Sequence, residues 1–438
     1  MKRHALVLCL LVAGGGPPSV AVAESLADGV VLEGPALLEA PDGGPGLPVA
    51  REGPRVYVRA FAGLPDGGKG TLWSSWGDGR LASNGRYYLS IGNHLDLAAG
   101  RGESRVYEFD PAARTLRLVV NVRDIIADAK FAGGKIHARI EEAADGSLYF
   151  ATYWGKVPKE ADWEAGFRGS ALLRFDPATG KTVDLGVPVP GQGLPASLVD
   201  RERGILYFYA VYSGDIVAYD VAKREATYRG GGDIQAGSRA FMLDSAGNVY
   251  FSTGDGRLAR YGFGTGKVVV IEARLPGGDA NGGSTLRAAT RAASGGLIYG
   301  MTKTGATFAF DPKRETVTDL GPNAGEKGDY TAVMVLSPDE RYIYYAPGAH
   351  GSGARLGVPI IQYEIAPKRR KVLAFLGPVL RERFRYNMGG TYNMQIASDG
   401  GTLLCTFNGA PVDPGEKRPK AFGLPSIVAI DIPKSERE

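Results

Sequence analysis

Short stretches in which apolar and polar residues alternate, separated by turns rich in glycine and aspartate, recur along most of the chain. Seven copies of one unit can be aligned, and each contains an apolar, aromatic stretch. These stretches read GRYYLSIGNH, GSLYFATYWG, GILYFYAVYSG, GNVYFSTGDG, GLIYGMTKTG, RYIYYAPGAHG and GTLLCTFNG. Each is followed by a second strand pattern and a hairpin, as in LLRFDPATGKTVDLG and TFAFDPKRETVTDLG. Alternation with a period of two predicts β-strands, so each unit is a small antiparallel sheet.

Repeats that offer four short strands each are typical of a β-propeller. One such sheet cannot bury both of its faces, whereas sheets stacked around an axis can. The seventh copy ends after its third strand, and RVYVRAFAG at residues 55–63 is predicted to supply the missing outer strand. The predicted fold class is therefore all-β, a seven-bladed β-propeller closed by an N-terminal strand. A β-sandwich pair or an open solenoid fits this pattern less well.

The first residues have the pattern of an export signal. Lys2 and Arg3 precede an apolar run and the small-residue stretch VAVAES, which predicts a signal peptide over residues 1–23 and a single propeller domain over residues 24–438. The predicted location is periplasmic or secreted. Cys405 is then the only cysteine of the mature chain, so no intramolecular disulfide is expected.

The charge balance excludes some partners. The formal charge of +4 falls by two when Lys2 and Arg3 are removed, which is too little to indicate binding to nucleic acid or to a membrane surface. We expect a monomer. Abundant glycine, at 64 residues, agrees with many tight turns.

Strand order predicts where unusual side chains meet. In a four-stranded blade the first strand begins on the same face as the loop that joins the second and third strands. Residues at these two places are expected to converge on one mouth of the central channel. They are His94, His137, Tyr153, Trp154, Tyr212, Arg239, Arg287, Lys303, Tyr330, His350, Tyr392 and Asn408. The three histidines are all that the predicted mature chain contains. Bridging of backbone carbonyls is an equal alternative for the arginines, and packing is the expected role of Tyr330 and Tyr392.

The long loops are predicted on the same face. GKVPKEADWEAGFRGS carries Trp163, and RERFRY carries Arg381, Arg383 and Arg385. Long loops on a rigid scaffold often carry function. A basic cleft with an aromatic rim is therefore expected.

No pair of carboxylates is evident at this mouth, which argues against ordinary glycoside hydrolysis. Histidine, tyrosine and arginine together suit β-elimination from a uronic-acid polysaccharide. An arginine or neutral histidine would bind the carboxylate, a tyrosine or histidine would remove the C5 proton, and a second group would protonate the departing oxygen. Trp154 or Trp163 would stack on a sugar ring.

The export signal, the seven repeats and the stretches SIGNH, GKIHARI, AVYSGD and SRAFML resemble the propeller-type polysaccharide lyases, in particular the ulvan lyases. The resemblance implies catalytic roles for His94, His137, Tyr212 and Arg239. Tyr153, Trp154, Trp163, Arg287, Lys303, His350, Arg385 and Asn408 are the expected substrate-binding residues, and the expected partner is an acidic polysaccharide.

Two other classes of function stay open. A non-catalytic propeller would bind an anionic glycan or a partner protein on the same face. Alternatively, His94, His137 and His350 could hold a divalent metal, as in a metal-dependent hydrolase. No HxH or HxxxH motif supports a metal site, and no other cofactor is predicted.

Overall fold

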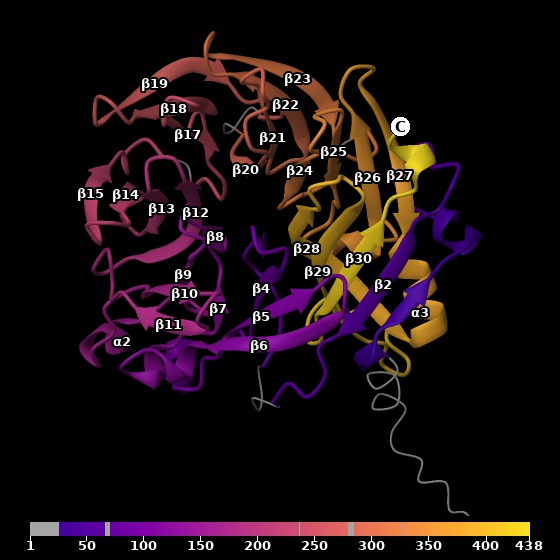
Figure 1. The fold of residues 1–438 in the computed structure, drawn as a ribbon, viewed down its shortest axis with the longest axis horizontal. Coiled ribbons are helices and arrows are strands. Elements are labelled where there is room, and N and C mark those ends of the chain that lie inside the picture. The colour runs from indigo at the N-terminus through magenta and orange to yellow at the C-terminus, as the bar shows by residue number, and fades with distance from the viewer. Residues whose placement is uncertain (1–25, 66–70, 236, 279–283, 327) are drawn as a thin grey trace, which may run out of the picture.

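The computed structural model describes residues 26–65, 71–235, 237–278, 284–326 and 328–438. The predicted signal peptide, residues 1–23, lies outside the described residues. Seven antiparallel sheets stand in a ring around a central channel, and the fold is a seven-bladed β-propeller (Figure 1). No helix in the described part of the chain is long and apolar enough to cross a membrane.

Six blades follow one another along the chain, each written here from its inner strand to its outer strand. Blade 1 is β3 (Arg80–Leu81), β4 (Tyr87–Gly92), β5 (Ser104–Asp110) and β6 (Thr115–Asn121). Blade 2 is β7 (Lys135–Ile136) with β8 (Glu141–Glu142), then β9 (Leu148–Tyr153), β10 (Leu172–Asp176) and β11 (Lys181–Asp184). Blade 3 is β12 (Gly193–Asp200), β13 (Ile205–Val211), β14 (Ile216–Asp220) and β15 (Glu225–Gly230).

The next three blades repeat this order. Blade 4 is β16 (Met242–Leu243), β17 (Val249–Ser252), β18 (Arg257–Gly262) and β19 (Lys267–Arg274). Blade 5 is β20 (Leu286–Ala289), β21 (Ile298–Thr302), β22 (Ala306–Asp311) and β23 (Thr316–Pro322). Blade 6 is β24 (Met334–Leu336), β25 (Tyr342–Tyr345), β26 (Pro359–Glu364) and β27 (Arg369–Phe375).

Blade 7 joins the two ends of the chain, as predicted. Its strands are β28 (Tyr386–Ile396), β29 (Thr402–Pro411), β30 (Ser426–Asp431), β2 (Arg55–Ala60) and β1 (Val30–Leu32). β2 pairs with β30 from Arg55 opposite Asp431 to Ala60 opposite Ser426. β1, a fifth strand outside β2, was not predicted. In Figure 1 the indigo β2 lies beside the yellow β30.

Burial explains the strand pattern. The second strand of each blade lies between neighbouring blades, so β4 is buried along its whole length and β9 in all but its last residue. The outer strands cover only one side, and β11 accordingly alternates exposed and half-buried residues. The apolar second strands therefore form the core between adjacent blades.

In blades 1, 2, 3 and 5 the hairpins between the third and fourth strands share one turn. The side-chain oxygens of Asp110, Asp176, Asp220 and Asp311 each accept a hydrogen bond at 2.9 to 3.0 Å from the backbone N–H two residues later. Such Asx turns are the reason that aspartate recurs at this place in the repeats.

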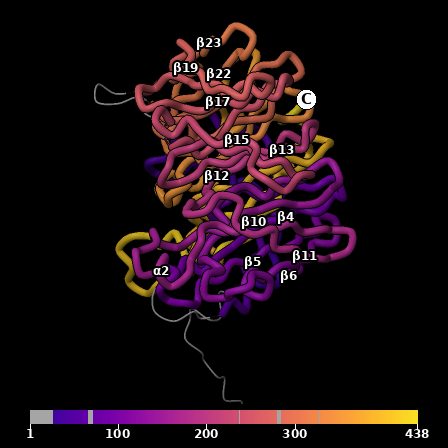
Figure 2. Tube along the Cα trace, turned by 90° about the vertical axis from the view of Figure 1, so that its left-hand side faces the viewer, coloured from indigo at the N-terminus to yellow at the C-terminus, as the bar shows by residue number. Residues whose placement is uncertain are grey.

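Short helices occupy the connections. They are η1 (Pro35–Leu38), η2 (Leu97–Ala99), η3 (Val122–Asp124), η4 (Ala129–Phe131), α2 (Glu160–Glu164), η5 (Ser352–Ala354), α3 (Leu376–Phe384) and η6 (Lys434–Glu436). Seen from the side, α2 and a yellow segment of blade 7 protrude on the same side of the ring (Figure 2). These two connections therefore rise from one face.

Candidate functional site

The channel narrows to a neck of about 40 Å³ near the ends at which the inner strands begin. Six of the seven blades place a larger side chain or a proline there, and blade 6 contributes Ala332 and Val333. The larger residues, from blade 1 to blade 7, are Trp76, His137, Pro195, Arg239, Arg287 and Tyr392. We call this end of the channel the mouth.

Trp76 lies at the centre of the mouth, and the three histidines surround it. The ring centroid of Trp76 is 5.1 Å from that of His94, 6.2 Å from that of His137 and 6.1 Å from that of His350. The places of the three histidines in their blades predicted that they would converge, and the structure brings their rings together around the Trp76 indole. Trp76 itself was not predicted.

Two further groups cover Trp76. Phe422, from the β29–β30 connection, is stacked on it with centroids 5.3 Å apart and ring planes inclined by 6°. The Nζ atom of Lys135 lies 4.5 Å from the indole centroid, a cation–π contact. The Lys135 side chain is buried, and burial together with the nearby Arg239 lowers its pKa to about 8.

His137 is held in one tautomer. It lies where blade 2's inner strand is interrupted between β7 and β8, and its Nδ1 is 2.9 Å from the carbonyl oxygen of Pro195. A carbonyl can only accept, so Nδ1 carries the hydrogen and Nε2 keeps a free lone pair. Burial and the charges of Arg239 and Lys135 hold the pKa of His137 well below its usual value.

His94 has an unusual backbone. It adopts φ = 58°, a left-handed conformation that is uncommon for residues other than glycine. Its buried Nδ1 has no hydrogen-bond partner in the described structure. Burial, with Lys135 and Lys156 adding to it, lowers its pKa to about 4, so the imidazole is neutral at pH 7.

Next to Trp76, four residues form one connected group, namely His350, Tyr392, Tyr330 and Arg287. His350 Nδ1 and the Tyr392 hydroxyl share a hydrogen bond of 2.9 Å. Tyr330 lies against His350 with ring centroids 4.5 Å apart and accepts a hydrogen bond from Arg287. Burial and Arg287 lower the pKa of His350. Tyr330 and Tyr392, expected to be packing residues, thus contact the charged and titratable groups of the mouth.

The mouth gathers positive charge without neutralising it. Lys135, Arg239, Arg287 and Lys303 form no ion pair with any carboxylate in the described part of the chain. Arg287 is 7% exposed, and Nη1 of Arg239 is buried without a hydrogen-bond partner among the described residues. An arginine stays protonated at any physiological pH, so the mouth is cationic and suits an anion.

The predicted aromatic residues of blade 2 separate into two groups. Tyr153 lies edge-on to His137 at 5.4 Å and belongs to the mouth. Trp154 is only 2% exposed and packs with Leu97 and Phe167, so its ring has no free face for a sugar. Tyr212 and Trp163 lie further out, with centroids 6.1 Å apart.

Tyr212 shows no ring contact with His94 or His137 in the described structure. It is 53% exposed and neighbours Trp154 and Trp163 instead. Burial of the hydroxyl and the charge of Asp162 raise its pKa, which disfavours the phenolate that a general base would need. Its position fits a binding residue better than the predicted catalytic one.

Three other expected binding residues do not line the neck. Asn408 is fully buried in β29, where its Oδ1 accepts from Ser75 N at 2.7 Å and its Nδ2 donates to Ser75 O at 2.9 Å. It therefore fastens blade 7 to blade 1 rather than facing a ligand. Arg385 ends α3 in a left-handed conformation with an exposed side chain. Lys303 is exposed in the β21–β22 turn, near enough to lower the pKa of His350.

The histidines do not form a metal-binding cluster. Among the described residues, no three side chains of histidine, cysteine, aspartate or glutamate come together as a group that could hold a metal ion. His94, His137 and His350 are instead spaced around the Trp76 ring.

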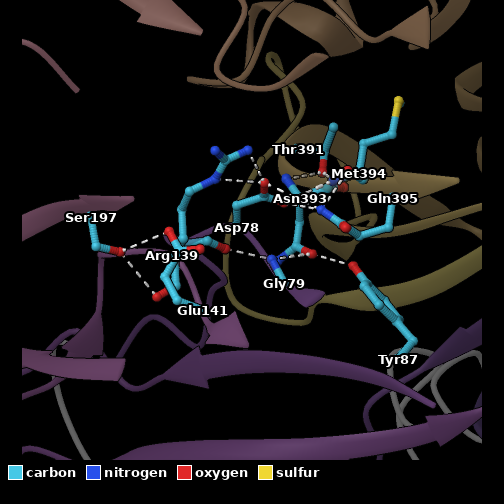
Figure 3. A network of polar contacts seen from close by, with 11 residues as sticks. Asp78, Gly79, Tyr87, Arg139, Glu141, Ser197, Thr391, Asn393, Met394 and Gln395 are labelled. Atoms are coloured by element: carbon cyan, nitrogen blue, oxygen red, sulfur yellow. Dashed lines mark hydrogen bonds and ion pairs between the residues drawn. The ribbon is translucent and has the colours of Figure 1, made fainter. Parts of the chain in front are cut away.

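Asp78 and Arg139 line the neck as well and form its boundary with the space beyond it, and Figure 3 shows the polar contacts around this pair. Asp78 accepts two hydrogen bonds from Arg139, at 2.8 and 3.1 Å, and another from the backbone of Met394. Glu141 accepts from the Ser197 hydroxyl at 3.3 Å. Past this pair the channel opens into a chamber of about 570 Å³, which we call the lower chamber.

Sequence reasoning missed Trp76 and Lys135. Trp76 precedes the turn glycine of its blade by the same interval as His137 and Arg287, as the pairs 76 and 85, 137 and 146, 287 and 296 show. That spacing could have identified Trp76 from the sequence. Lys135 stands two residues before His137, on the same side of its strand, but nothing in the sequence distinguishes it from a solvated lysine.

The comparisons with known proteins extend no further than the fold. No protein-family model matches the chain, and no curated protein matches it. It is similar to a crystal structure of RRP9 WD40 repeats, with a TM-score of 0.52, 9% identity, and coverage of 86% of this chain and 97% of that chain. A structure of U3-55K gives a TM-score of 0.51 at 10% identity, covering 86% and 98%. A chain of the mitotic checkpoint complex gives 0.50 at 9%, covering 99% and 97%.

Proposed function

We propose that this protein binds an acidic polysaccharide at the mouth and cleaves it by β-elimination. The observation that carries the proposal is the meeting of unpaired cations with neutral imidazoles. Lys135, Arg239 and Arg287 have no carboxylate partner in the described structure, and His94 and His137 are uncharged at pH 7. A cationic cleft concentrates a polyanion, and neutral imidazoles can accept protons.

The arginines would bind the uronate carboxylate. Arg239 has a buried Nη1 that lacks a partner in the part of the chain that the structure describes, and Arg287 donates a hydrogen bond to Tyr330. A guanidinium binds a carboxylate through two parallel hydrogen bonds. As the C5 proton leaves, negative charge moves onto the carboxylate, so these contacts strengthen in the transition state and lower the barrier.

Proton removal would fall to His137 or Lys135. His137 offers its free Nε2 lone pair, and Lys135, with a pKa of about 8, is close to the best value for proton transfer near neutral pH. The C5–H electrons form the C4=C5 double bond, and the C4–O bond breaks. The departing oxygen takes a proton from an acid, for which the Tyr392 hydroxyl, hydrogen-bonded to His350, is the candidate.

Binding without catalysis is the second candidate. The neck measures about 40 Å³, and the Phe422 ring is stacked on Trp76. A sugar would then bind on top of these rings rather than among them. The strongly lowered pKa of His137 also makes it a weak base.

The predicted signal peptide leads us to propose that the protein acts in the periplasm or outside the cell. A polymeric acidic substrate fits either place.

The test is the absorbance of unsaturated uronate while the protein is incubated with a panel of acidic polysaccharides, ulvan and pectin included. We expect a rise with at least one of them. His137→Gln and Arg239→Gln should each slow it by about 100-fold or more. Arg314→Gln, which changes an exposed arginine in an outer hairpin, is the matched control. Binding without any rise in absorbance would favour the second candidate.

A further inference from the structure

A row of aromatic rings leads from the mouth to the outer rim over blades 2 and 3. It begins at Trp76 and continues through His137, Tyr153, Trp154 and Tyr212 to Trp163. Successive ring centroids are 6.2, 5.4, 4.5, 5.7 and 6.1 Å apart. The two outermost rings belong to the β13–β14 turn and to α2, so two separate connections contribute to the same end.

The outer rings are accessible, whereas the ring between them and the mouth supports them from below. Tyr212 is 53% exposed, and Trp163 is half-buried. Trp154 is buried under Tyr212, and its indole lies so close to Gly193 that a Cβ there would meet the ring at 2.2 Å. The platform is thus fixed by the blades and not by loops alone.

The backbone at Tyr212 is strained. Its φ of 89° lies in the region that favours glycine, yet the chain holds a tyrosine there with more than half of the side chain in solvent. A bulky residue in this conformation costs free energy, and an exposed ring recovers little of it by packing. Such an outlier points to a contact made with something outside the chain.

The charges near the outer rings and at the mouth indicate which class of ligand fits this row of rings. The connection that holds Trp163 carries three acidic residues, Glu160, Asp162 and Glu164, and three basic ones, Lys156, Lys159 and Arg168, so its net charge is zero and does not attract an anion. The cations lie at the mouth. A chain of sugars matches both features, because one unit can place its carboxylate at the mouth while later units lay their apolar ring faces on tyrosine and tryptophan.

We propose that Tyr212 and Trp163 form an outer stacking subsite for sugar residues. The ligand is then a glycan chain that runs from the mouth outward over blades 2 and 3, rather than a single sugar. The inference rests on the proposed function for the acidic nature of the glycan. It assigns Tyr212 to binding rather than to proton transfer.

The experiment measures the dissociation constants of ulvan and polygalacturonate, and of their disaccharides, for the full chain and three variants. Tyr212→Gly and Trp163→Ala should each weaken polymer binding by about tenfold and leave disaccharide binding unchanged. Phe263→Ala, which removes an exposed aromatic ring from a β18–β19 turn, should change neither.

Thermal unfolding separates a contact role from a packing role. Since glycine relieves the strain at position 212, Tyr212→Gly should unfold at or above the temperature of the wild type. Loss of stability, or polymer binding equal to that of the wild type, would overturn the subsite.

The outcomes also distinguish a failure of the stacking subsite from a failure of the proposed lyase activity. Cleavage by the wild type that both variants retain in full, with unchanged polymer affinity, overturns the subsite and leaves the lyase. Polymer binding that the variants lose, without any cleavage by the wild type, supports the subsite and overturns the lyase. If no glycan binds the wild type, both proposals are wrong.

Discussion

The two ends of the central channel differ in whether their charged side chains are paired. In the lower chamber, Arg139 pairs with Asp78 at 2.8 Å, Arg80 with Glu142 at 3.1 Å and Arg291 with Glu340 at 2.9 Å. At the mouth, Lys135, Arg239 and Arg287 have no acidic partner in the described structure. The same strands build both ends, so the difference lies in the side chains alone.

The comparison separates charges that hold the fold from charges that, as we propose, are available to a ligand. A buried ion pair whose lone pairs are satisfied is expensive to break. Like charges left unpaired in a narrow space repel one another and lose hydration, so they weaken the fold until an anion joins them. Each prediction below tests one side of this contrast.

The largest effect is expected at the lower end. Asp78→Ala removes the carboxylate that pairs with the half-buried Arg139 guanidinium and the acceptor of Met394 N. The free energy of unfolding should fall by about 4 kcal/mol in chemical denaturation. Asp255→Ala breaks an exposed pair with Arg257 and should cost much less, because solvent screens such a pair. Equal losses in the two variants would remove the contrast.

At the mouth, Lys135 should weaken the fold at neutral pH. Its pKa is about 8 in the folded protein and about 10.5 when unfolded, so the unfolded chain binds more protons between these values. Stability contributed by this group therefore rises as the pH increases from 8 to 10.5.

The test compares the wild type with Lys135→Met. At pH 7 the variant should be more stable by about 3 kcal/mol, and the difference should disappear towards pH 10.5. Denaturant unfolding at several pH values measures both. Stability curves that stay parallel over this range would show that Lys135 is not desolvated.

A smaller effect in the same direction is expected from His94. Its pKa is about 4 in the folded protein, below the ordinary 6.5. The unfolded chain takes up the proton first on acidification, so stability is lost as the pH falls from 6.5 to 4. His94→Asn, a residue that accepts the left-handed backbone, should lose about 2 kcal/mol less than the wild type over this range. Identical acid sensitivity would contradict the neutral, buried imidazole.

The fold could be predicted because the apolar pattern of each repeat follows directly from which strands are buried. Strands such as β9, enclosed between blades, must be apolar along their length, and the aspartate turns mark the hairpins. β2 was predicted to close the ring because one blade lacked an outer strand. β1 was missed, since three residues with no turn of their own give no periodic signal.

The site was predicted less completely. The position of a residue in its strand predicts the face of the propeller on which it lies, but not how deeply its side chain is buried. His94, His137 and His350 were placed at the mouth correctly by their positions in the blades. Such positions could not tell that Asn408 turns inward to the Ser75 backbone or that Trp154 is covered. Both outcomes depend on contacts with residues distant in the sequence.

The central claim is that the mouth binds an acidic glycan through its unpaired cations. The direct measurement is the affinity of the wild type, of Arg239→Gln/Arg287→Gln and of Arg314→Gln/Arg369→Gln for the panel of acidic polysaccharides. Both double variants lose two positive charges, but the second pair lies on exposed outer hairpins. We predict about 100-fold weaker binding for the mouth variant and unchanged binding for the other. Equal losses in both variants would contradict the account, because binding would then follow net charge and not the mouth.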